Sequence, residues 1–443
     1  MAYDIVQSAW LLGIAANGAS SIKVPSTITD GQSFLEQNLS LYLNGNTQDQ
    51  GGTFPGFLSV FNTQVANGPW EIAWGPHVYL APGCNEATNA MFVAKYTDTS
   101  VTPNASTYVV AIAATNPASF YDWIKEDAQV EATLTVQWPL PANYVYSAHT
   151  HLPYDANTPL ISAGTALGIS NLLNNVKPKN GPDIQTFLSQ SANANDTLIF
   201  AGHSLAGALT PTLAFYLYPT GSTNSGWKQV LVLPTAGATP GNGGPGLTEK
   251  NPTGFAQLFT QNFPQVSTGL SPYTTWNTDY ANQADVVPHA WNQLGDFIPT
   301  LSLTNPWGVL SAGMAVTLTG LLKTAQGIAL DGHYTNLPQT TFAPSGKMYS
   351  WILNSQTDQY EYPPTAVDAP VYSKENPLST NDDLGSALLV SHVQAYFFFF
   401  NVLPGPRMPP GGLVPVPLQA DGTPPQPAPT RKDLERQAAL LSS

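Results

Sequence analysis

The chain has 443 residues, enough to bury a large hydrophobic core. Only 9% of the residues are Asp, Glu, Lys or Arg, and 28 acidic side chains against 14 basic ones give a formal net charge of −14. This balance argues against a nucleic acid partner and against attachment to anionic lipid through basic residues, but it leaves neutral, apolar substrates open.

The sequence predicts neither a disulfide nor a bound cofactor. Cys84 is the single cysteine, which excludes an intrachain disulfide and a cysteine-based metal cluster. His149 and His151 form an H-x-H pair, but no acidic or histidine residues accompany them at the spacing of metal ligands. We therefore expect no metal ion and no organic cofactor.

Two apolar stretches bear on membranes and export. The run over residues 9–16 follows Asp4 rather than the basic residues that begin a signal peptide, so we expect it to be part of the fold. The stretch 305–322 contains Asn, Ser, Thr and Gly and is too polar to span a bilayer, so we expect no transmembrane anchor. The composition, rich in Asn, Ser and Thr, is compatible with secretion, which we favour weakly although no clear signal peptide is present. No pattern indicates the oligomeric state.

Predicted strands and helices alternate along the first part of the chain. Residues 106–116 have the continuous apolar character of a buried parallel strand. Residues 117–129 follow as a predicted amphipathic helix, with Phe120, Trp123 and Ile124 on one face.

The next predicted elements complete an α/β pattern. Strands are predicted over 196–202 and 228–237, and a helix begins at Ser204, although Pro211 should kink or end it. Residues 382–403 are predicted to form a last helix or helix pair. This order predicts a mostly parallel central sheet flanked by helices.

The chain divides into one main domain and a tail. We expect residues 1–403 to form the main domain, with an inserted, cap-like subdomain at about 300–380. Residues 404–443 are rich in proline at first and end in a short predicted helix, so we expect a tail without a core of its own.

The stretch "LIFAGHSLAGAL", residues 198–209, has the pattern of a nucleophile elbow. Such an elbow is a strand, a sharp turn at the serine and a helix, and small residues must stand two before and two after the serine. Gly202, Ala206 and Gly207 supply them around Ser204. The alternative is a serine that caps the start of an ordinary core helix.

Several blocks of the sequence resemble the class 3 lipase family, the fungal type of α/β-hydrolase. "GHSLAGAL" resembles the family's "GHSLGGAL", and similar blocks occur in the same order: "YVVAIAATNPASFYDWIKE", "LVLPTAGATPGN", "YANQADVVPHAW" and "SHVQAYF". They span residues 106–397 with long unmatched insertions between them. Ala206 replaces the family's second elbow glycine, and Ala113-Ala114 replaces an Arg-Gly pair.

Acyl transfer by a serine needs a histidine base and a carboxylate that orients it, in the chain order Ser, Asp, His for this fold. Asp285 should lie on a loop at the end of a strand and matches the family's acid, with Asp279 as its rival. His392 lies downstream and matches the family's base, with His333 as its rival.

The resemblance also implies an oxyanion hole and a lid. The backbone N–H of Leu205, directly after the serine, should be one donor, and Thr115 matches the family position of the second. The segment after Thr115 matches the lid, in which Phe120, Trp123 and Ile124 would cover the serine in water and turn outward at a lipid surface. Exposing each of these side chains costs roughly 1.5–3 kcal/mol, so opening would need an apolar surface.

These features together predict a serine carboxylic-ester hydrolase, with a triacylglycerol lipase as the first choice and a lipid or other ester as its substrate, met at a lipid–water interface. An esterase for feruloyl or other soluble esters and a phospholipase A1 use the same chemistry and stay open. A non-catalytic binding protein on a hydrolase fold is a more distant alternative, favoured only by the Ala113-Ala114 departure.

Overall fold

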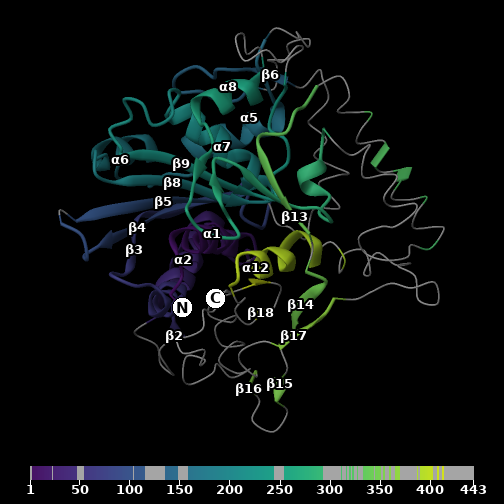
Figure 1. The fold of residues 1–443 in the computed structure, drawn as a ribbon. Helices are drawn as coiled ribbons and strands as arrows, with labels where there is room; N and C mark the ends of the chain where they lie inside the picture. The colour runs from purple at the N-terminus through teal and green to yellow at the C-terminus, as the bar shows by residue number, and fades with distance from the viewer. Residues whose placement is uncertain are drawn as a thin grey trace.

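The structure, a computed structural model, describes most of the chain as far as residue 292 and shorter segments beyond it (Figure 1). The described residues are 2–21, 23–46, 54–102, 104–114, 135–147, 158–243, 254–292, 311, 316, 319–320, 322–323, 327, 333–343, 345–350, 353–354, 359–360, 365–369, 387, 390–402, 407–408 and 412–413.

A seven-stranded sheet in the order β13-β12-β9-β8-β5-β4-β3 forms the centre of the molecule. From β5 to β13 each strand runs parallel to its neighbour, whereas β3, β4 and β5 pair antiparallel. The predicted mostly parallel sheet is therefore confirmed. In chain order the strands are β3 (Trp70–Tyr79), β4 (Asn89–Asp98), β5 (Ala105–Ala114), β8 (Thr197–His203), β9 (Gln229–Thr235), β12 (Asp279–Asn282) and β13 (Gln339–Phe342).

Helices cover both faces of this sheet (Figure 1). One face packs against α1 (Ile5–Ala16), α2 (Gly31–Asn44), α3 (Phe57–Phe61) and α12 (Ala395–Phe399). The other face packs against α5 (Ala163–Asn174), α6 (Ile184–Ser191), α7 (Leu205–Leu217) and α8 (Phe255–Asn262). Because both faces are buried, the central strands are continuous apolar runs rather than alternating ones.

The helix α1 contains the apolar run at residues 9–16 and is almost wholly buried, as expected for part of the fold. Asp4 caps it, accepting from the backbone N–H groups of Val6 and Gln7 at 2.9 Å, while the Gln7 side chain accepts from Asp4 N in return. Gln7 also donates to the Phe400 carbonyl at 2.8 Å. This bond ties the start of the chain to the segment that follows α12.

Pro211 does not end the helix that follows the serine, which corrects one half of the expectation; a kink at Pro211 stays a prediction. The helix α7 continues to Leu217 with Pro211 inside it. Thr210 and Thr212, on either side, donate their hydroxyls to the carbonyls of Ala206 and Ala208 at 2.6 and 2.8 Å. The helix α7 is buried between the sheet and α5, and this packing stabilises it by more than one proline destabilises it.

The range predicted as an insertion contributes a strand to the main sheet. β13 pairs in parallel with β12 at the sheet edge, with Asp279 opposite Gln339. The pairs β14 (Lys347–Ser350) with β17 (Thr365–Asp368) and β15 (Leu353–Asn354) with β16 (Gln359–Tyr360) are antiparallel and outside that sheet. Whether residues 300–380 form a separate subdomain stays a prediction.

Small antiparallel pairs complete the described elements. They are β1 (Gly45–Asn46) with β2 (Phe54–Pro55), β6 (Thr135–Gln137) with β7 (Leu160–Ser162), β10 (Val266–Ser267) with β11 (Thr275–Trp276), and β18 (Arg407–Met408) with β19 (Gly412–Leu413). The helix predicted over 117–129 lies outside the described residues. None of the described helices is both long and apolar enough to cross a membrane.

Candidate active site

Ser204 lies on a sharp turn between β8 and α7. Its backbone φ is 65° and its ψ is −131°, a conformation that is strained for a residue with a side chain. A Cβ on Gly202 would lie 2.4 Å from Thr210 Oγ1, and one on Gly207 would lie 2.6 Å from Gly237 Cα. The small residues around Ser204 are therefore required by close packing, as the elbow pattern predicts.

Ser204, His392 and Asp285 form one continuous hydrogen-bonded chain. Ser204 Oγ lies 2.8 Å from His392 Nε2, and His392 Nδ1 lies 2.8 Å from Asp285 Oδ2. An ionised carboxylate only accepts, so Nδ1 carries the proton and Nε2 is left to accept from the serine hydroxyl. The three side chains are buried, and the residue with most exposure, Ser204, is 8% exposed.

Asp285 is held by two further donors. Val287 N–H donates to Oδ1, and the Tyr396 hydroxyl donates to Oδ2, each at 3.0 Å. The Tyr396 hydroxyl also accepts from Asn282 N–H at 3.1 Å. Burial, and then the nearby charge of Asp285, hold the pKa of Tyr396 well above its ordinary value, so the phenol keeps the proton that it donates.

The rival residues lie elsewhere. Asp279, at the start of β12, accepts from Gly237 N–H at 3.0 Å and from the Gln339 amide at 3.2 Å. Its carboxyl therefore anchors the loop after β9 and does not bond to His392. His333 packs near Gly243, whose N–H donates to its carbonyl at 3.1 Å.

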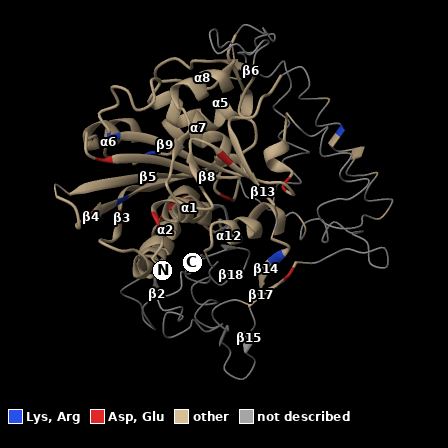
Figure 2. Cartoon of the chain, viewed as in Figure 1, with Lys and Arg blue, Asp and Glu red and all other residues tan. Residues whose placement is uncertain are grey.

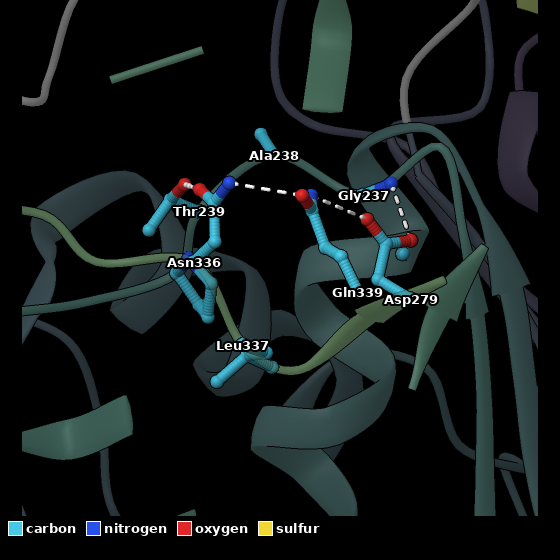
Figure 3. Close-up of a pocket in the computed structure, with 9 residues that line it drawn as sticks. Gly237, Ala238, Thr239, Asp279, Asn336, Leu337 and Gln339 are labelled. Carbon is cyan, nitrogen blue, oxygen red and sulfur yellow. Dashed lines mark hydrogen bonds between the residues drawn. The ribbon is translucent and has the colours of Figure 1, made fainter. Parts of the chain in front are cut away.

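Asp279 ends a chain of polar side chains in a small pocket beside the elbow (Figure 3). Thr239 donates to Asn336 at 2.7 Å, Asn336 to Gln339 at 3.0 Å and Gln339 to Asp279. Burial raises the pKa of Asp279 to about 7 although the bonds from Gly237 N–H and the Gln339 amide oppose the shift. The cavity of about 10 Å³ is near the least volume that holds one water molecule.

The predicted oxyanion donors and lid are described only in part. Leu205 is the first residue of α7, so its backbone N–H is among those that have no acceptor within the helix. Thr115, Phe120, Trp123 and Ile124 lie outside the described residues. β5 is described as far as Ala114, directly before Thr115.

Charged side chains and groups of metal ligands are sparse over the described part of the chain. Figure 2 shows few charged residues over the described chain. Within the described segments, no group of three or more His, Cys, Asp or Glu side chains could hold a metal ion.

Three residues that contact the chain of Ser204, His392 and Asp285 were not among the sequence candidates. Tyr396 bonds to Asp285, Asn282 donates to the Ser391 carbonyl at 2.7 Å, and His203 lies 2.8 Å from the His392 carbonyl. Tyr396 and Asn282 stand inside the quoted blocks, but nothing in the local sequence shows what their side chains contact. His203 has one local signal: it adjoins Ser204 in sequence, so its side chain should point away from the serine.

Comparison with known proteins supports the fold. No family model matches the sequence, and no curated protein matches it either. The structure is similar to the crystal structure of M37 lipase, with a TM-score of 0.54 and 20% sequence identity, over 90% of this chain and 93% of that one. With the mostly parallel sheet and its flanking helices, this likeness identifies an α/β-hydrolase fold.

Proposed function

We propose that the protein is a serine carboxylic-ester hydrolase with Ser204 as nucleophile, His392 as base and Asp285 as the acid that orients it. The observation that carries the proposal is the buried chain of two 2.8 Å contacts from Ser204 to His392 and on to Asp285. The strained backbone at Ser204 supports it, because it aims the hydroxyl out of the turn at the end of β8.

The chemistry follows from this order of groups. Ser204 Oγ attacks the ester carbonyl as its proton passes to His392 Nε2, and the tetrahedral intermediate then expels the alcohol, which takes that proton. Water attacks the resulting acyl-enzyme and gives a proton to His392, which returns it to Ser204 Oγ as the carboxylic acid leaves. Asp285 stabilises the imidazolium in both halves without taking its proton. The reaction needs no metal ion or organic cofactor.

The oxyanion of each tetrahedral intermediate would be bound by backbone N–H groups. Leu205 is well placed by its position at the start of α7, where the helix N-terminus also favours negative charge. Thr115 is the second predicted donor. Each such donor typically contributes about 10²–10³ in rate.

As substrate we propose a triacylglycerol, and as family the class 3 lipases. The support is the order of the sequence blocks, the low surface charge and the similarity to a protein named as a lipase. Ser204 is buried, so substrate reaches its hydroxyl only when some part of the chain moves. As that part we propose a lid that contains Phe120, Trp123 and Ile124. A soluble-ester esterase uses the same triad and is one outcome of the test, and a phospholipase A1 stays an alternative with the same triad.

The test compares wild type with Ser204→Ala on two substrates: a short-chain ester below and above its solubility limit, and an emulsified triglyceride. Losing the nucleophile should cost on the order of 10⁶ in turnover. A rate that rises when an interface forms, with triglyceride cleavage, supports the lipase. Cleavage of the soluble ester alone, without a rise, identifies an esterase. Equal inactivity of both proteins favours the non-catalytic alternative.

The proposed tail is tested by the same assay. A chain ending at residue 403 should keep its turnover on both substrates, because every proposed catalytic residue lies before that point. Loss of hydrolysis on truncation would show that residues 404–443 belong to the catalytic domain.

A further inference from the structure

His203 precedes the proposed nucleophile, yet its side chain contacts the segment that carries the proposed base. His203 Nε2 lies 2.8 Å from the His392 carbonyl oxygen and Nδ1 lies 3.0 Å from Thr235 Oγ1. A carbonyl only accepts, so Nε2 carries the proton and Nδ1 accepts from the threonine hydroxyl. The ring is 2% exposed, which removes water as a competing partner.

The surroundings of His203 favour the neutral ring. Burial, and then the neighbouring His392, hold the pKa of His203 well below its ordinary value of 6.5. The ring centroid lies 4.9 Å from that of His392 and meets Tyr396 edge-on at 5.0 Å. The side chain is therefore packed in one orientation with its donor aimed at the His392 main chain.

Asn282 makes the equivalent bond to the preceding peptide. Its amide Nδ2 donates to the Ser391 carbonyl at 2.7 Å, and its Oδ1 accepts from Ala284 N–H at 3.1 Å. Two successive carbonyls, those of Ser391 and His392, are thus each bound by a buried side chain.

Both bonds are made to the segment Val390–Gln394, which carries His392. The helical structure of this segment is less regular than that of α12. Residues Val390–Gln394 form a single π-helical turn before the five-residue helix α12. The turn runs directly into α12 but departs from regular α-helical hydrogen bonding, so contacts from outside contribute to where the His392 ring lies.

The donors come from the elements that carry the other two members of the proposed triad. His203 is the last residue of β8 and adjoins Ser204, and Asn282 is the last residue of β12, three residues before Asp285. If the segment that carries His392 moved, it would therefore lose one hydrogen bond to β8, which leads to Ser204, and one to β12, which leads to Asp285.

We infer that His203 and Asn282 are positioning residues, which bind the carbonyls of His392 and Ser391 and so hold the base in line with Ser204 and Asp285. This inference rests on the proposed function. Displacing a reacting group by about 1 Å can cost on the order of 10² in rate.

The first test replaces the donor and then restores it. His203→Phe keeps a ring but loses the bond to the His392 carbonyl, and we expect kcat for a soluble ester to fall about 10–100-fold with KM little changed. His203→Gln can place an amide N–H near the position of Nε2 and should recover most of this loss. His77→Phe removes a histidine in the edge strand β3, three strands from β8, and is the matched control that should keep the wild-type kcat.

A double-mutant cycle shows whether His203 acts through His392. In a His392→Ala background, where the residual rate comes from the remaining site, His203→Phe should cause no further loss. The same 10–100-fold loss in both backgrounds would overturn the inference, because His203 would then act on Ser204 or on the fold. Circular dichroism and thermal unfolding accompany each variant. If His203→Phe does not fold, Asn282→Ala takes its place in the cycle.

Failure of the inference differs from failure of the proposed function. If Ser204→Ala is inactive while His203→Phe and Asn282→Ala both match wild type, only the positioning role is wrong. If Ser204→Ala keeps the wild-type rate, the proposed function is wrong and the positioning role falls with it.

Discussion

The two sides of the candidate site are built in different ways. On the serine side, β8, the turn at Ser204 and α7 follow one another within residues 197–217, and close contacts of small residues fix their geometry. On the histidine side, a short turn at 390–394 is held by side chains more than a hundred residues away in sequence. The first side depends on steric fit and the second on buried hydrogen bonds, so different substitutions should damage each.

Asp285→Asn should have a large effect on the histidine side although it leaves the base itself in place. The amide would favour the wrong tautomer of His392, and we expect kcat to fall by about 10⁴ with the fold intact. Steady-state hydrolysis of a soluble ester measures this loss. Asp279→Asn is the comparison, and a greater loss from it than from Asp285→Asn would assign the acid to the rival residue.

Asp279 should instead govern how stability depends on pH. Its folded pKa is about 7 and its ordinary value is 3.8, so the folded protein keeps a proton that the unfolded chain releases. The free energy of unfolding should therefore fall as the pH rises from about 4 to about 7, by an amount on the order of a few kcal/mol at most.

Asp279→Asn removes this titration. The new amide can replace the carboxyl if the amides of Gln339 and Asn336 turn over, because that chain can run in either direction. We expect the variant to gain stability relative to wild type across this pH window, as measured by urea unfolding at several pH values. Identical slopes for the two proteins would contradict this account of Asp279.

Tyr396→Phe weakens the histidine side without removing a member of the proposed triad. It deletes the donor to Asp285 while keeping the ring packed on His203 and Phe342. A hydrogen bond to a charged group is worth about 1.5–3 kcal/mol, so we expect kcat to fall about 10–100-fold.

Tyr42→Phe is the matched control for this change. Its buried hydroxyl has no hydrogen-bond partner among the described residues, so its removal should leave kcat unchanged and stability the same or slightly higher. Equal kcat losses in the two tyrosine variants would show that Tyr396 has no special effect on the site.

The serine side should be sensitive to added volume. Gly207→Ala places a Cβ about 2.6 Å from Gly237 Cα and 2.8 Å from the Thr235 carbonyl, both of them backbone atoms that move only with their strand or loop. We expect a loss of about 1–3 kcal/mol in unfolding free energy. Thermal or urea unfolding measures it.

Gly164→Ala gives the smallest expected effect and has the opposite sign. A Cβ there would meet nothing nearer than Ser162 Oγ at 4.0 Å, so alanine should stabilise α5 by up to about 1 kcal/mol. Destabilisation by both glycine variants would mean that helix context rather than the contact with Gly237 decides the result.

The serine side could be predicted from the sequence to a greater extent than the histidine side. The strands at 197–203 and 229–235 and the elbow were predictable because neighbouring residues determine them. The helix does not end at Pro211, because tertiary packing outweighs the local preference of proline. Nothing local could reveal that His203 bonds to the carbonyl of a residue 189 positions away, or that β13 joins the main sheet.

The central claim, that Ser204 is a nucleophile activated by His392, is tested most directly by covalent labelling. Wild type, Ser204→Ala and His392→Ala are treated with an ester-like phosphonate that reacts with activated serines, and the adduct is located by peptide mass spectrometry. We predict one adduct, on Ser204 in wild type, much slower labelling of His392→Ala and none of Ser204→Ala. Absence of an adduct in wild type, or an adduct on another residue, would contradict the claim.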